Sequence, residues 1–295
     1  MKKVIDKASV LIEALPYIQK FRDAVVVVKF GGSAMEDPEL VKNTMRDIVF
    51  MECIGMKPVV VHGGGKAISA ELQRQNIKVE FINGLRNTCA DTIKVVDHVL
   101  HEHVNKNLIG HGEAAGGKVT SISGKKILSA EKLVPKCPNT GEDLDIGYVG
   151  NIIDVDTTEI YEALEQGLIP VIPPLALGDD DQVYNINADI AACKITEALK
   201  ARKLVFLSDV PGIMNDPSDE DSVIGTIKSD EVQGLIDNKV ITGGMIPKVM
   251  SSVHALDAGT NKVHMIDGRL QHSLLLEIFT SEGVGTQIVK PDSVL

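Results

Sequence analysis

The sequence predicts an α/β protein in which helices pack on both faces of a mostly parallel β-sheet. Four aliphatic runs, at positions 25–28, 58–61, 168–173 and 203–208, lack the polar alternation of a half-exposed strand, which is typical of strands buried on both faces. Glycine turns and helical patterns follow several of these runs, and this repeated order indicates a doubly wound sheet. Ligands of such sheets bind at the carboxyl ends of the strands.

Composition agrees with this fold class and disfavours several partners. The 295 residues are 44% hydrophobic, enough for one large domain or two lobes, but only 3% are aromatic and tryptophan is absent. A net charge of -11 disfavours nucleic acid and anionic membranes as partners. Any bound anion therefore needs local positive groups.

No stretch is apolar and long enough to span a bilayer, and residues 1–15 lack the features of a secretory signal. We therefore expect a cytoplasmic protein with no membrane partner. The cysteines lie far apart without the spacing of metal ligands, and we expect them to be reduced. They are Cys53, Cys89, Cys137 and Cys193.

The segment before the first strand has apolar residues at helical spacing, with a proline among them. Proline removes a backbone donor and clashes with the preceding turn, so we expect a helix that is kinked at Pro16. This helix packs either on its own subunit or, as an arm, on another. The apolar positions are Val4, Ala8, Leu11, Leu15 and Ile18.

Residues 25–33 combine a buried strand with a turn that suits an anion. Lys29 stands where the strand leaves the core, and Gly31 and Gly32 let the backbone approach a ligand closely. The alternative is an ordinary strand end, where a lysine reaches water and glycines form a turn.

The same order of strand, glycines and helix recurs further along the chain. Asp37 is expected to cap a helix that begins at Pro38. The strand at 58–61 then leads into glycines 63–65 and a helix whose positive end points back at them. Three glycines exceed what a turn needs, so an anion site is favoured. Their spacing fits neither a P-loop nor a dinucleotide-binding motif.

The middle of the chain carries a turn at residues 83–86 that ends in Arg86. Its guanidinium offers a planar fork to a carboxylate, although a solvated surface arginine is the alternative. We expect a helix over 91–108, short strands of a hairpin layer at 118–122, 127–128 and 148–155, and a helix near 157–166.

Short polar residues cluster just before a predicted helix at 190–200. Asn185, Asn187 and Asp189 alternate with apolar residues, so their side chains should share one side of the segment, as a polar site requires. Asp189 has an alternative role as the N-cap of the helix.

The last third of the chain places a lysine against a helix dipole. After a turn from Asp209 to Gly212, Pro247 opens a helix with Lys248 in its first turn, where a cation costs up to about 1 kcal/mol. A bound phosphate would reverse that sign. Strands at 263–266 and 283–289 and a short helix or strand at 274–279 complete the chain.

Six motifs, taken in order, resemble those of the amino acid kinase family. They are Lys-Phe-Gly-Gly-Ser, His-Gly-Gly-Gly, Asn-Gly-Leu-Arg, Asn-Ile-Asn-Ala-Asp, Leu-Ser-Asp-Val-Pro-Gly and Gly-Gly-Met-Ile-Pro-Lys. The resemblance spans residues 25–289, and the third and fourth motifs are similar to members that phosphorylate N-acetyl-L-glutamate. It implies a carbamate kinase-like fold, a three-layer αβα sandwich around a mostly parallel sheet. It also implies an oligomerisation arm (1–21), an acetylglutamate-binding lobe (22–199) and an ATP-binding lobe (200–295).

The activity that the resemblance implies is transfer of a phosphoryl group from ATP to the side-chain carboxylate of N-acetyl-L-glutamate, in arginine biosynthesis. The product is an acyl phosphate, and Mg²⁺ is carried on the nucleotide phosphates. Because the nucleophile is already ionised, no general base is needed, and alignment with charge neutralisation suffices. Two alternatives remain open: an N-acetylaminoadipate-type kinase of lysine biosynthesis, and a non-catalytic arginine sensor on the same scaffold.

The family pattern also implies the roles of individual residues. Lys29 and Lys248 would stabilise the transferring phosphoryl group, the amides of Gly32 and Gly64 would bond its oxygens, and Asp189 would orient both lysines. The residues implied to bind acetylglutamate are Gly64, Gly65, Arg86 and Asn185, and those implied to bind the nucleotide are Lys29, Asp209, Gly212 and Lys248.

The N-terminal segment resembles that of arginine-inhibited members, in which a kinked helix interlaces dimers into a hexamer. We therefore expect a homo-oligomer, a trimer of dimers, that L-arginine inhibits; whether a signalling protein also binds is left open. The matching positions are Tyr17, His264, Glu277 and Gly283, although His264 has an alternative role in the core. Residues 123–126 depart from the family, with a lysine where relatives often carry an aspartate.

Overall fold

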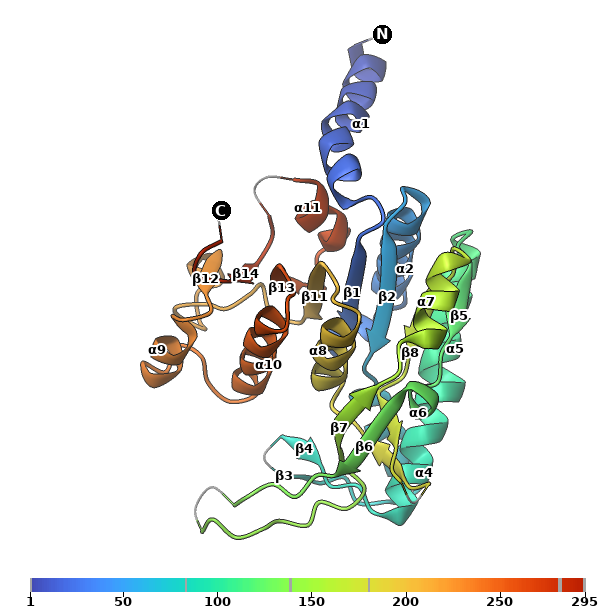
Figure 1. The fold of residues 1–295 in the computed structure, drawn as a ribbon, viewed down its shortest axis with the longest axis vertical. Helices are drawn as coiled ribbons and strands as arrows, with labels where there is room; N and C mark the ends of the chain where they lie inside the picture. The colour runs from blue at the N-terminus through green and yellow to red at the C-terminus, as the bar shows by residue number, and fades with distance from the viewer. Residues whose placement is uncertain (1, 83, 138–139, 180, 281–282, 294–295) are drawn as a thin grey trace.

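The chain forms a long central β-sheet with helices on both faces, and a smaller sheet at one end (Figure 1). The computed structural model describes residues 2–82, 84–137, 140–179, 181–280 and 283–293, and the side chains of residues 2–8, 10, 11 and 33 fall outside this description.

The central sheet has the strand order β12-β14-β13-β11-β1-β2-β8-β5. In this order, every two adjacent strands from β13 through to β5 are parallel. β14 is antiparallel to β13 and parallel to β12. This arrangement confirms the mostly parallel sheet that the sequence predicts. The strands are β1 (Val25–Phe30), β2 (Lys57–His62), β5 (Val119–Ser121), β8 (Ile169–Ile172), β11 (Lys203–Ser208), β12 (Thr226–Lys228), β13 (Lys262–Asp267) and β14 (Thr286–Val289).

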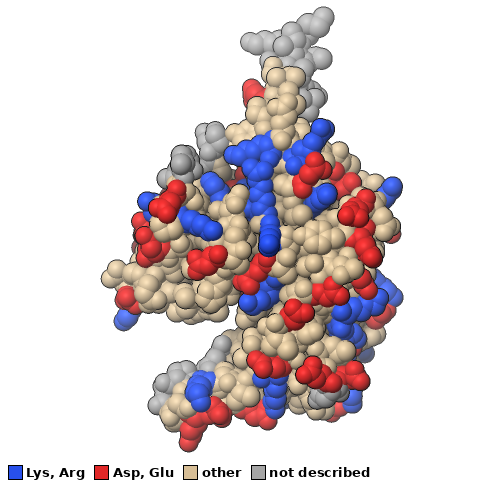
Figure 2. Space-filling model, in the orientation of Figure 1, with Lys and Arg blue, Asp and Glu red and all other residues tan. Residues whose placement is uncertain are grey.

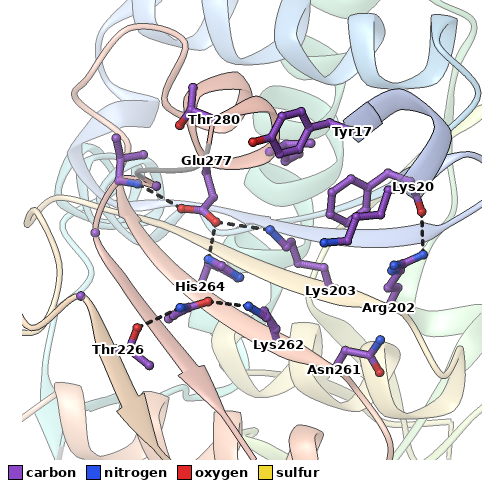
Figure 3. A pocket seen from close by; sticks show the side chains of 17 residues that line it. Tyr17, Lys20, Arg202, Lys203, Thr226, Asn261, Lys262, His264, Glu277 and Thr280 are labelled. Atoms are coloured by element: carbon purple, nitrogen blue, oxygen red, sulfur yellow. Dashed lines mark hydrogen bonds and ion pairs between the residues drawn. The ribbon is translucent and has the colours of Figure 1, made fainter. Parts of the chain in front are cut away.

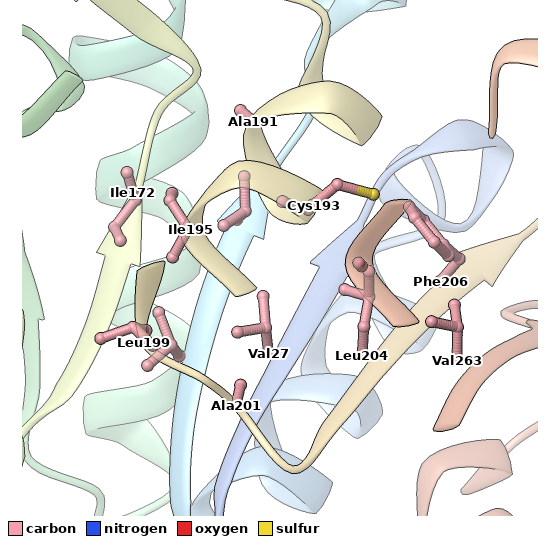
Figure 4. Close-up of a cluster of buried hydrophobic side chains, with 14 of the residues drawn as sticks. Val27, Ile172, Ala191, Cys193, Ile195, Leu199, Ala201, Leu204, Phe206 and Val263 are labelled. Carbon is pink, nitrogen blue, oxygen red and sulfur yellow. The ribbon is translucent and has the colours of Figure 1, made fainter. Parts of the chain in front are cut away.

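The run of valines in β1 is buried because the strand lies between two hydrophobic cores. Val26 and Val28 belong to the core on one face of the sheet, and Val27 belongs to the core on the other. Figure 4 shows Val27 beside Leu204 of β11, under the helix that carries Ile195. Both faces are apolar, which accounts for the missing polar alternation.

Helices cover each face of the central sheet. One layer contains α2 (Pro38–Cys53), α5 (Lys106–Ala114) and α11 (Ser273–Phe279), and the other contains α7 (Thr158–Glu165), α8 (Ala188–Ala198) and α10 (Met245–Asp257). The segment predicted as a short helix or strand at 274–279 is thus a helix. Asp37 caps α2 as expected, with its Oδ1 accepting a hydrogen bond from the Glu39 amide at 2.8 Å. The remaining helices are α3 (Gly65–Arg74), α4 (Ala90–His98), α6 (Gly124–Ile127) and α9 (Val232–Asp237).

A second sheet, of order β10-β9-β6-β7, lies beyond the carboxyl ends of β1 and β2 (Figure 1). The antiparallel pair of β6 and β7 confirms part of the predicted hairpin layer, and the hairpin of β3 (Phe81–Ile82) and β4 (Leu85–Arg86) lies beside the cavity described below. The assignment of 118–122 to that layer is wrong, because β5 pairs in parallel with β8 as the edge strand of the central sheet. The strand expected at 127–128 is displaced, because Ile127 ends α6 and the strand starts at Leu128. The strands are β6 (Leu128–Lys132), β7 (Gly150–Val155), β9 (Leu175–Leu177) and β10 (Val183–Asn185).

The single helix predicted over 91–108 is longer and irregular. Between α4 and α5 the chain forms a π-helix, η2 (Val99–Asn105). Such segments are rare and are found frequently at functional sites, since the wider turn re-aims the side chains that follow.

The N-terminal helix, α1 (Lys2–Phe21), runs through Pro16 and projects from the body of the molecule (Figure 1). The kink at Pro16 stays a prediction, and the side chains of the predicted apolar positions 4, 8 and 11 lie outside the described residues. Ile12 and Leu15 are 67% and 44% exposed. No helix in the described part of the chain is long and apolar enough to cross a membrane. The division into lobes at residue 199 stays a prediction.

Candidate functional site

A cavity of about 230 Å³ opens at the carboxyl ends of β1 and β2. Figure 2 shows the molecule hollowed on this side, between the part that carries α9 and α10 and the part that carries β3 and β4. The cavity brings together predicted site residues from four separate segments of the chain. They are Lys29, Gly32, Gly64, Gly65, Arg86, Asn185 and Asp189.

Two lysines and one aspartate form an ionic cluster at this cavity. Asp189 lies 2.9 Å from the Lys29 ammonium and 3.9 Å from that of Lys248. The three side chains are between 11% and 20% exposed, so water screens their charges poorly. Two cations against one carboxylate leave one positive charge, which suits an anionic ligand.

The protonation of this cluster follows from burial and from its charges. Burial alone would raise the pKa of Asp189, but the ammonium groups of Lys29 and Lys248 outweigh it and hold the pKa below its usual range. Burial lowers the pKa of Lys248, and the charge of Lys29 adds to this effect while Asp189 opposes it. Asp189 is therefore an anion that bridges two cations.

Asp189 is not the N-cap of α8, so that alternative is wrong. The cap is Asn187, whose Oδ1 accepts hydrogen bonds from the amides of Asp189 at 2.8 Å and Ile190 at 3.2 Å. Because Asn187 satisfies these amides, the carboxylate of Asp189 is available to the lysines.

Other groups approach the glycines of both turns closely. A Cβ on Gly31 would lie 2.5 Å from the Lys29 ammonium nitrogen, and one on Gly64 would lie 2.6 Å from Leu100 Cδ2. Gly32 has a φ of +73°, in the left-handed region, and lies beside the carboxylate of Asp209. Gly32 and Gly64, which carry no side chain, both line the cavity.

Arg86 is buried, so the alternative of a solvated surface arginine is wrong. Its Nη2 donates to the carbonyl oxygen of Gly65 at 2.7 Å and to Ser69 Oγ at 2.9 Å, and its guanidinium lies 4.8 Å from the centre of the Phe81 ring. Its Nη1 is buried and has no hydrogen-bond partner among the described residues. A buried donor without a partner is costly, and a ligand carboxylate would satisfy it. Asn83 of the same motif lies outside the described residues.

Asn185 lines the cavity, whereas three of the residues predicted to bind the nucleotide lie outside its lining. Asn185 lines it and donates to Thr88 Oγ1 at 3.2 Å. Lys248, Asp209 and Gly212 are not among its lining residues, and Gly212 packs against Thr286 of β14. Lys248 reaches the ionic cluster from the first turn of α10, whose cap, Gly244, offers no side chain to the helix.

A larger opening of about 1040 Å³ adjoins this cavity. It shares Gly32, Gly64, Gly65 and Phe81 with the cavity and extends to Lys66, η2 and α5. Among the described residues, no group of three His, Cys, Asp or Glu side chains is placed to hold a metal ion.

A second cavity, of about 540 Å³, lies at the opposite end of the central strands (Figure 3). It brings together Tyr17, His264, Glu277 and Gly283, the positions that the family resemblance grouped. Sequence reasoning missed its basic residues. Figure 2 shows Lys and Arg side chains gathered at the foot of α1. The basic residues that line the cavity are Lys20, Arg202, Lys203 and Lys262.

His264 and Glu277 form a buried pair in this second cavity. His264 Nδ1 lies 2.5 Å from Glu277 Oε1, and Lys203 lies 3.3 Å from the same oxygen. Burial lowers the pKa of His264 to about 4, so the ring is neutral near pH 7. Burial would raise the pKa of Glu277, but the hydrogen bond from His264 and the charge of Lys203 hold that pKa below its usual range. His264 Nε2 is buried without a partner among the described residues, so His264 is not a fully satisfied core histidine.

The sequence of the chain matches a known family over most of its length. Residues 24–267 match the model of the amino acid kinase family. The chain belongs to the amino acid kinase family. The resemblance carried by the six motifs is thereby confirmed.

Curated relatives match almost the whole chain. The acetylglutamate kinase of Akkermansia muciniphila is 47% identical over 290 residues, which cover 98% of this chain and 97% of the relative. The acetylglutamate kinase of a Thermoanaerobacter species is 48% identical over 288 residues, which cover 97% of this chain and 94% of that relative.

Solved structures confirm the fold class. N-acetylglutamate synthase from Neisseria gonorrhoeae, complexed with coenzyme A and N-acetyl-glutamate, has a TM-score of 0.85 at 24% identity, and covers 97% of this chain. This chain spans 64% of the length of that synthase. Carbamate kinase from Giardia has a TM-score of 0.65 at 15% identity, covering 90% of this chain and 98% of that one.

Proposed function

We propose that the chain phosphorylates the side-chain carboxylate of N-acetyl-L-glutamate with ATP, in arginine biosynthesis. The observation that carries the proposal is the cluster of Lys29, Asp189 and Lys248 beside the unpaired donor of Arg86, in a chain 47% identical to an acetylglutamate kinase over nearly its full length. The aminoadipate alternative is disfavoured, since the curated relatives reported above all carry the acetylglutamate kinase name.

In the proposed reaction, a carboxylate oxygen of acetylglutamate forms a bond to the γ-phosphorus while the bond from that phosphorus to the β,γ-bridging oxygen breaks. The electron pair of the broken bond stays with ADP, and no proton moves. Lys29 and Lys248 offset the negative charge on the equatorial oxygens of the transferring phosphoryl group. The amides of Gly32 and Gly64 donate hydrogen bonds to these oxygens. The carboxylate nucleophile needs no general base, which agrees with a site rich in cations and amides.

The two ligands would enter from different sides of the ionic cluster. Arg86 Nη1 would donate to the α-carboxylate of acetylglutamate, and Gly65 and Asn185 would complete that side. ATP would lie along the turn from Asp209 to Gly212. Mg²⁺ would be held by the phosphate oxygens, which are ligands that it prefers.

We further propose that the second cavity binds L-arginine as an inhibitor. Its Glu277 carboxylate and the unpaired His264 Nε2 are acceptors that suit a guanidinium, and its lysines suit a carboxylate. In support, N-acetylglutamate synthase from Neisseria gonorrhoeae has been solved with coenzyme A and L-arginine; it is 26% identical, with a TM-score of 0.80, over 96% of this chain and 65% of that one.

We also propose that α1 is an oligomerisation arm of a hexamer, a trimer of dimers. The helix projects from the body, and its apolar Ile12 and Leu15 are more than one third exposed (Figure 1). An exposed apolar stripe on a projecting helix suits a second copy of the chain.

Coupled measurement of ADP release tests the proposed activity. ADP release that depends on acetylglutamate, at a kcat/KM at least tenfold above that with N-acetylaminoadipate, is expected. ADP release at a rate that does not depend on acetylglutamate would refute the assignment.

Deletion of residues 1–21 is expected to lower the oligomer mass and to remove inhibition by arginine, because Tyr17 and Lys20 line the second cavity. An unchanged mass would contradict the role of the arm.

A further inference from the structure

The peptide that joins Gly63 to Gly64 is held in place by a buried histidine. His62 ends β2, is 0% exposed, and its Nδ1 lies 2.8 Å from the carbonyl oxygen of Gly63. On its other side Gly63 is fixed through its own amide, which donates to the carbonyl oxygen of Phe30 at 2.7 Å. The glycine turn is therefore tied both to β1 and to the end of β2.

The neighbours of His62 settle which of its nitrogens carries the proton. A carbonyl oxygen only accepts, so Nδ1 must donate to Gly63. Nε2 lies 3.2 Å from Asn105 Nδ2, and the same Nδ2 donates to the carbonyl oxygen of Val171 at 3.1 Å. Asn105 is thus turned with its donor toward the ring, and Nε2 accepts.

The π-helix brings Asn105 to this position. Asn105 is the last residue of η2, and the same segment places Leu100 and Val104 against Gly64. A Cβ on Gly64 would lie 3.4 Å from Val104 Cγ2 and closer still to Leu100. One irregular stretch of helix therefore fixes the glycine turn by packing and by a hydrogen bond through His62.

The orientation of the Gly63 carbonyl determines where the next amide points. In a trans peptide the N–H of one residue and the C=O of the preceding residue project to opposite sides. With the Gly63 oxygen bonded to His62, the N–H of Gly64 is directed away from the core. Gly64 itself lines the cavity that holds Lys29 and Asp189.

We propose that His62, set in one tautomer by Asn105, is a positioning residue that holds the Gly64 amide toward the transferring phosphoryl group. The inference rests on the proposed function, because it presumes that this amide donates to a phosphoryl oxygen. His62 touches neither substrate and gives up no proton. Burial supports the role, since it lowers the pKa of His62 to about 4 and keeps the ring neutral at neutral pH.

Two substitutions at His62 separate positioning from packing. In His62→Asn the side-chain amide nitrogen can replace Nδ1 and donate to Gly63, whereas in His62→Gln the longer side chain places its amide near the site of Nε2 instead. Each variant is measured by coupled ADP release, by thermal unfolding, and by calorimetric binding of ADP, aluminium fluoride and acetylglutamate, a mimic of the transition state.

We expect His62→Gln to lower kcat by about 10- to 100-fold, with KM for acetylglutamate and ATP changed less than about threefold, because only a transition-state donor is misdirected. Affinity for the mimic should fall by a similar factor, and affinity for acetylglutamate alone should not. His62→Asn should keep kcat within about threefold of the unsubstituted chain. Asn105→Leu, which leaves Nε2 without a donor, should show the same pattern as His62→Gln with a smaller loss.

Several outcomes would overturn the inference. A normal kcat in His62→Gln, equal losses in His62→Asn and His62→Gln, or a rise of KM that matches the fall of kcat would each exclude a positioning role. If His62→Gln does not fold, Asn105→Leu decides: an unchanged kcat refutes the inference. Failure of the proposed function is distinct, because the unsubstituted chain would then show no ADP release dependent on acetylglutamate.

Discussion

The two cavities lie at opposite ends of the central sheet, and each holds a carboxylate beside lysines, but the two carboxylates have different partners. At the carboxyl ends of β1 and β2, Asp189 bridges Lys29 and Lys248 and leaves one positive charge. At the amino ends of β11 and β13, Glu277 contacts Lys203 and a neutral His264 that has an unpaired acceptor. The first arrangement suits a phosphoryl group, and the second suits a ligand with a cation of its own. A neutral histidine in place of a second ammonium group therefore distinguishes the second ionic cluster from the first.

The largest expected effect comes from a substitution that removes one lysine of the first ionic cluster. Lys29→Met should lower kcat by about a thousandfold, because it removes a cation that acts on the transition state and leaves Asp189 with one partner fewer. Coupled ADP release measures the loss. Lys42→Met, at an exposed position on α2, is the matched control and should keep kcat. Undiminished turnover in Lys29→Met would refute the catalytic assignment.

Substitution of Arg86 tests the substrate side of the same cavity. Arg86→Lys should raise KM for acetylglutamate by about 10- to 100-fold, because an ammonium cannot bond Gly65, Ser69 and a carboxylate in the same plane. Initial rates over a range of acetylglutamate concentrations give the value. Arg74→Lys, at a 74% exposed side chain, is the control. A change of KM for ATP alone would contradict the assignment.

The neutral His264 of the second cavity should affect how the free energy of unfolding depends on pH. His264 has its pKa lowered from 6.5 to about 4. Between these values the unfolded chain binds more protons than the folded one, so the free energy of unfolding falls as the pH is lowered through this window. For one such histidine the loss between pH 7 and pH 5 is about 2 kcal/mol.

His264→Gln should therefore make the fall in unfolding free energy between pH 7 and pH 5 shallower by about 2 kcal/mol. Urea unfolding at both pH values measures it. A histidine charged in the folded state would give no such change. His62 of the first region has a similarly lowered pKa and should add a loss of its own.

The smallest effect concerns the edge of the second cavity. Tyr17→Phe should raise the arginine concentration for half-inhibition by about fivefold, the value of one hydrogen bond of about 1 kcal/mol. Rates across an arginine titration provide the measurement. No change would place the hydroxyl outside the ligand's reach.

The fold could be predicted from the sequence because its signals are local. Four adjacent valines predict a strand covered on both faces, and three of them, Val26–Val28, are fully buried. Asp37 followed by proline starts a helix on its own. The π-helix could not be predicted, since its apolar spacing within residues 91–108 resembles that of an ordinary helix. Its irregularity depends on tertiary contacts, such as that of Asn105 with His62.

The candidate site was predictable where a residue conflicts with its local structure. Lys248 opposes its helix dipole, and the consecutive glycines exceed the needs of a turn. The role of Asp189 was ambiguous in the sequence, because either Asp189 or Asn187, two residues earlier, could cap the helix. Lys203 and Lys262 gave no sequence signal, since each simply begins a strand; only the register, which pairs them across β11 and β13, reveals a basic edge.

The register of β1 with β11 has a consequence for how the two ends of the sheet influence each other. Val26 pairs with Lys203 and Lys29 with Phe206, so the two lysines stand three residues, roughly 10 Å, apart along the strands. Their ionic partners differ, Asp189 for Lys29 and Glu277 for Lys203. The residues between them on β1 and β11 are buried and aliphatic. Substitutions in the two clusters should thus add in free energy. Because no ion pair joins the two clusters, a ligand that couples the two cavities would act chiefly through shifts of the packed strands and helices.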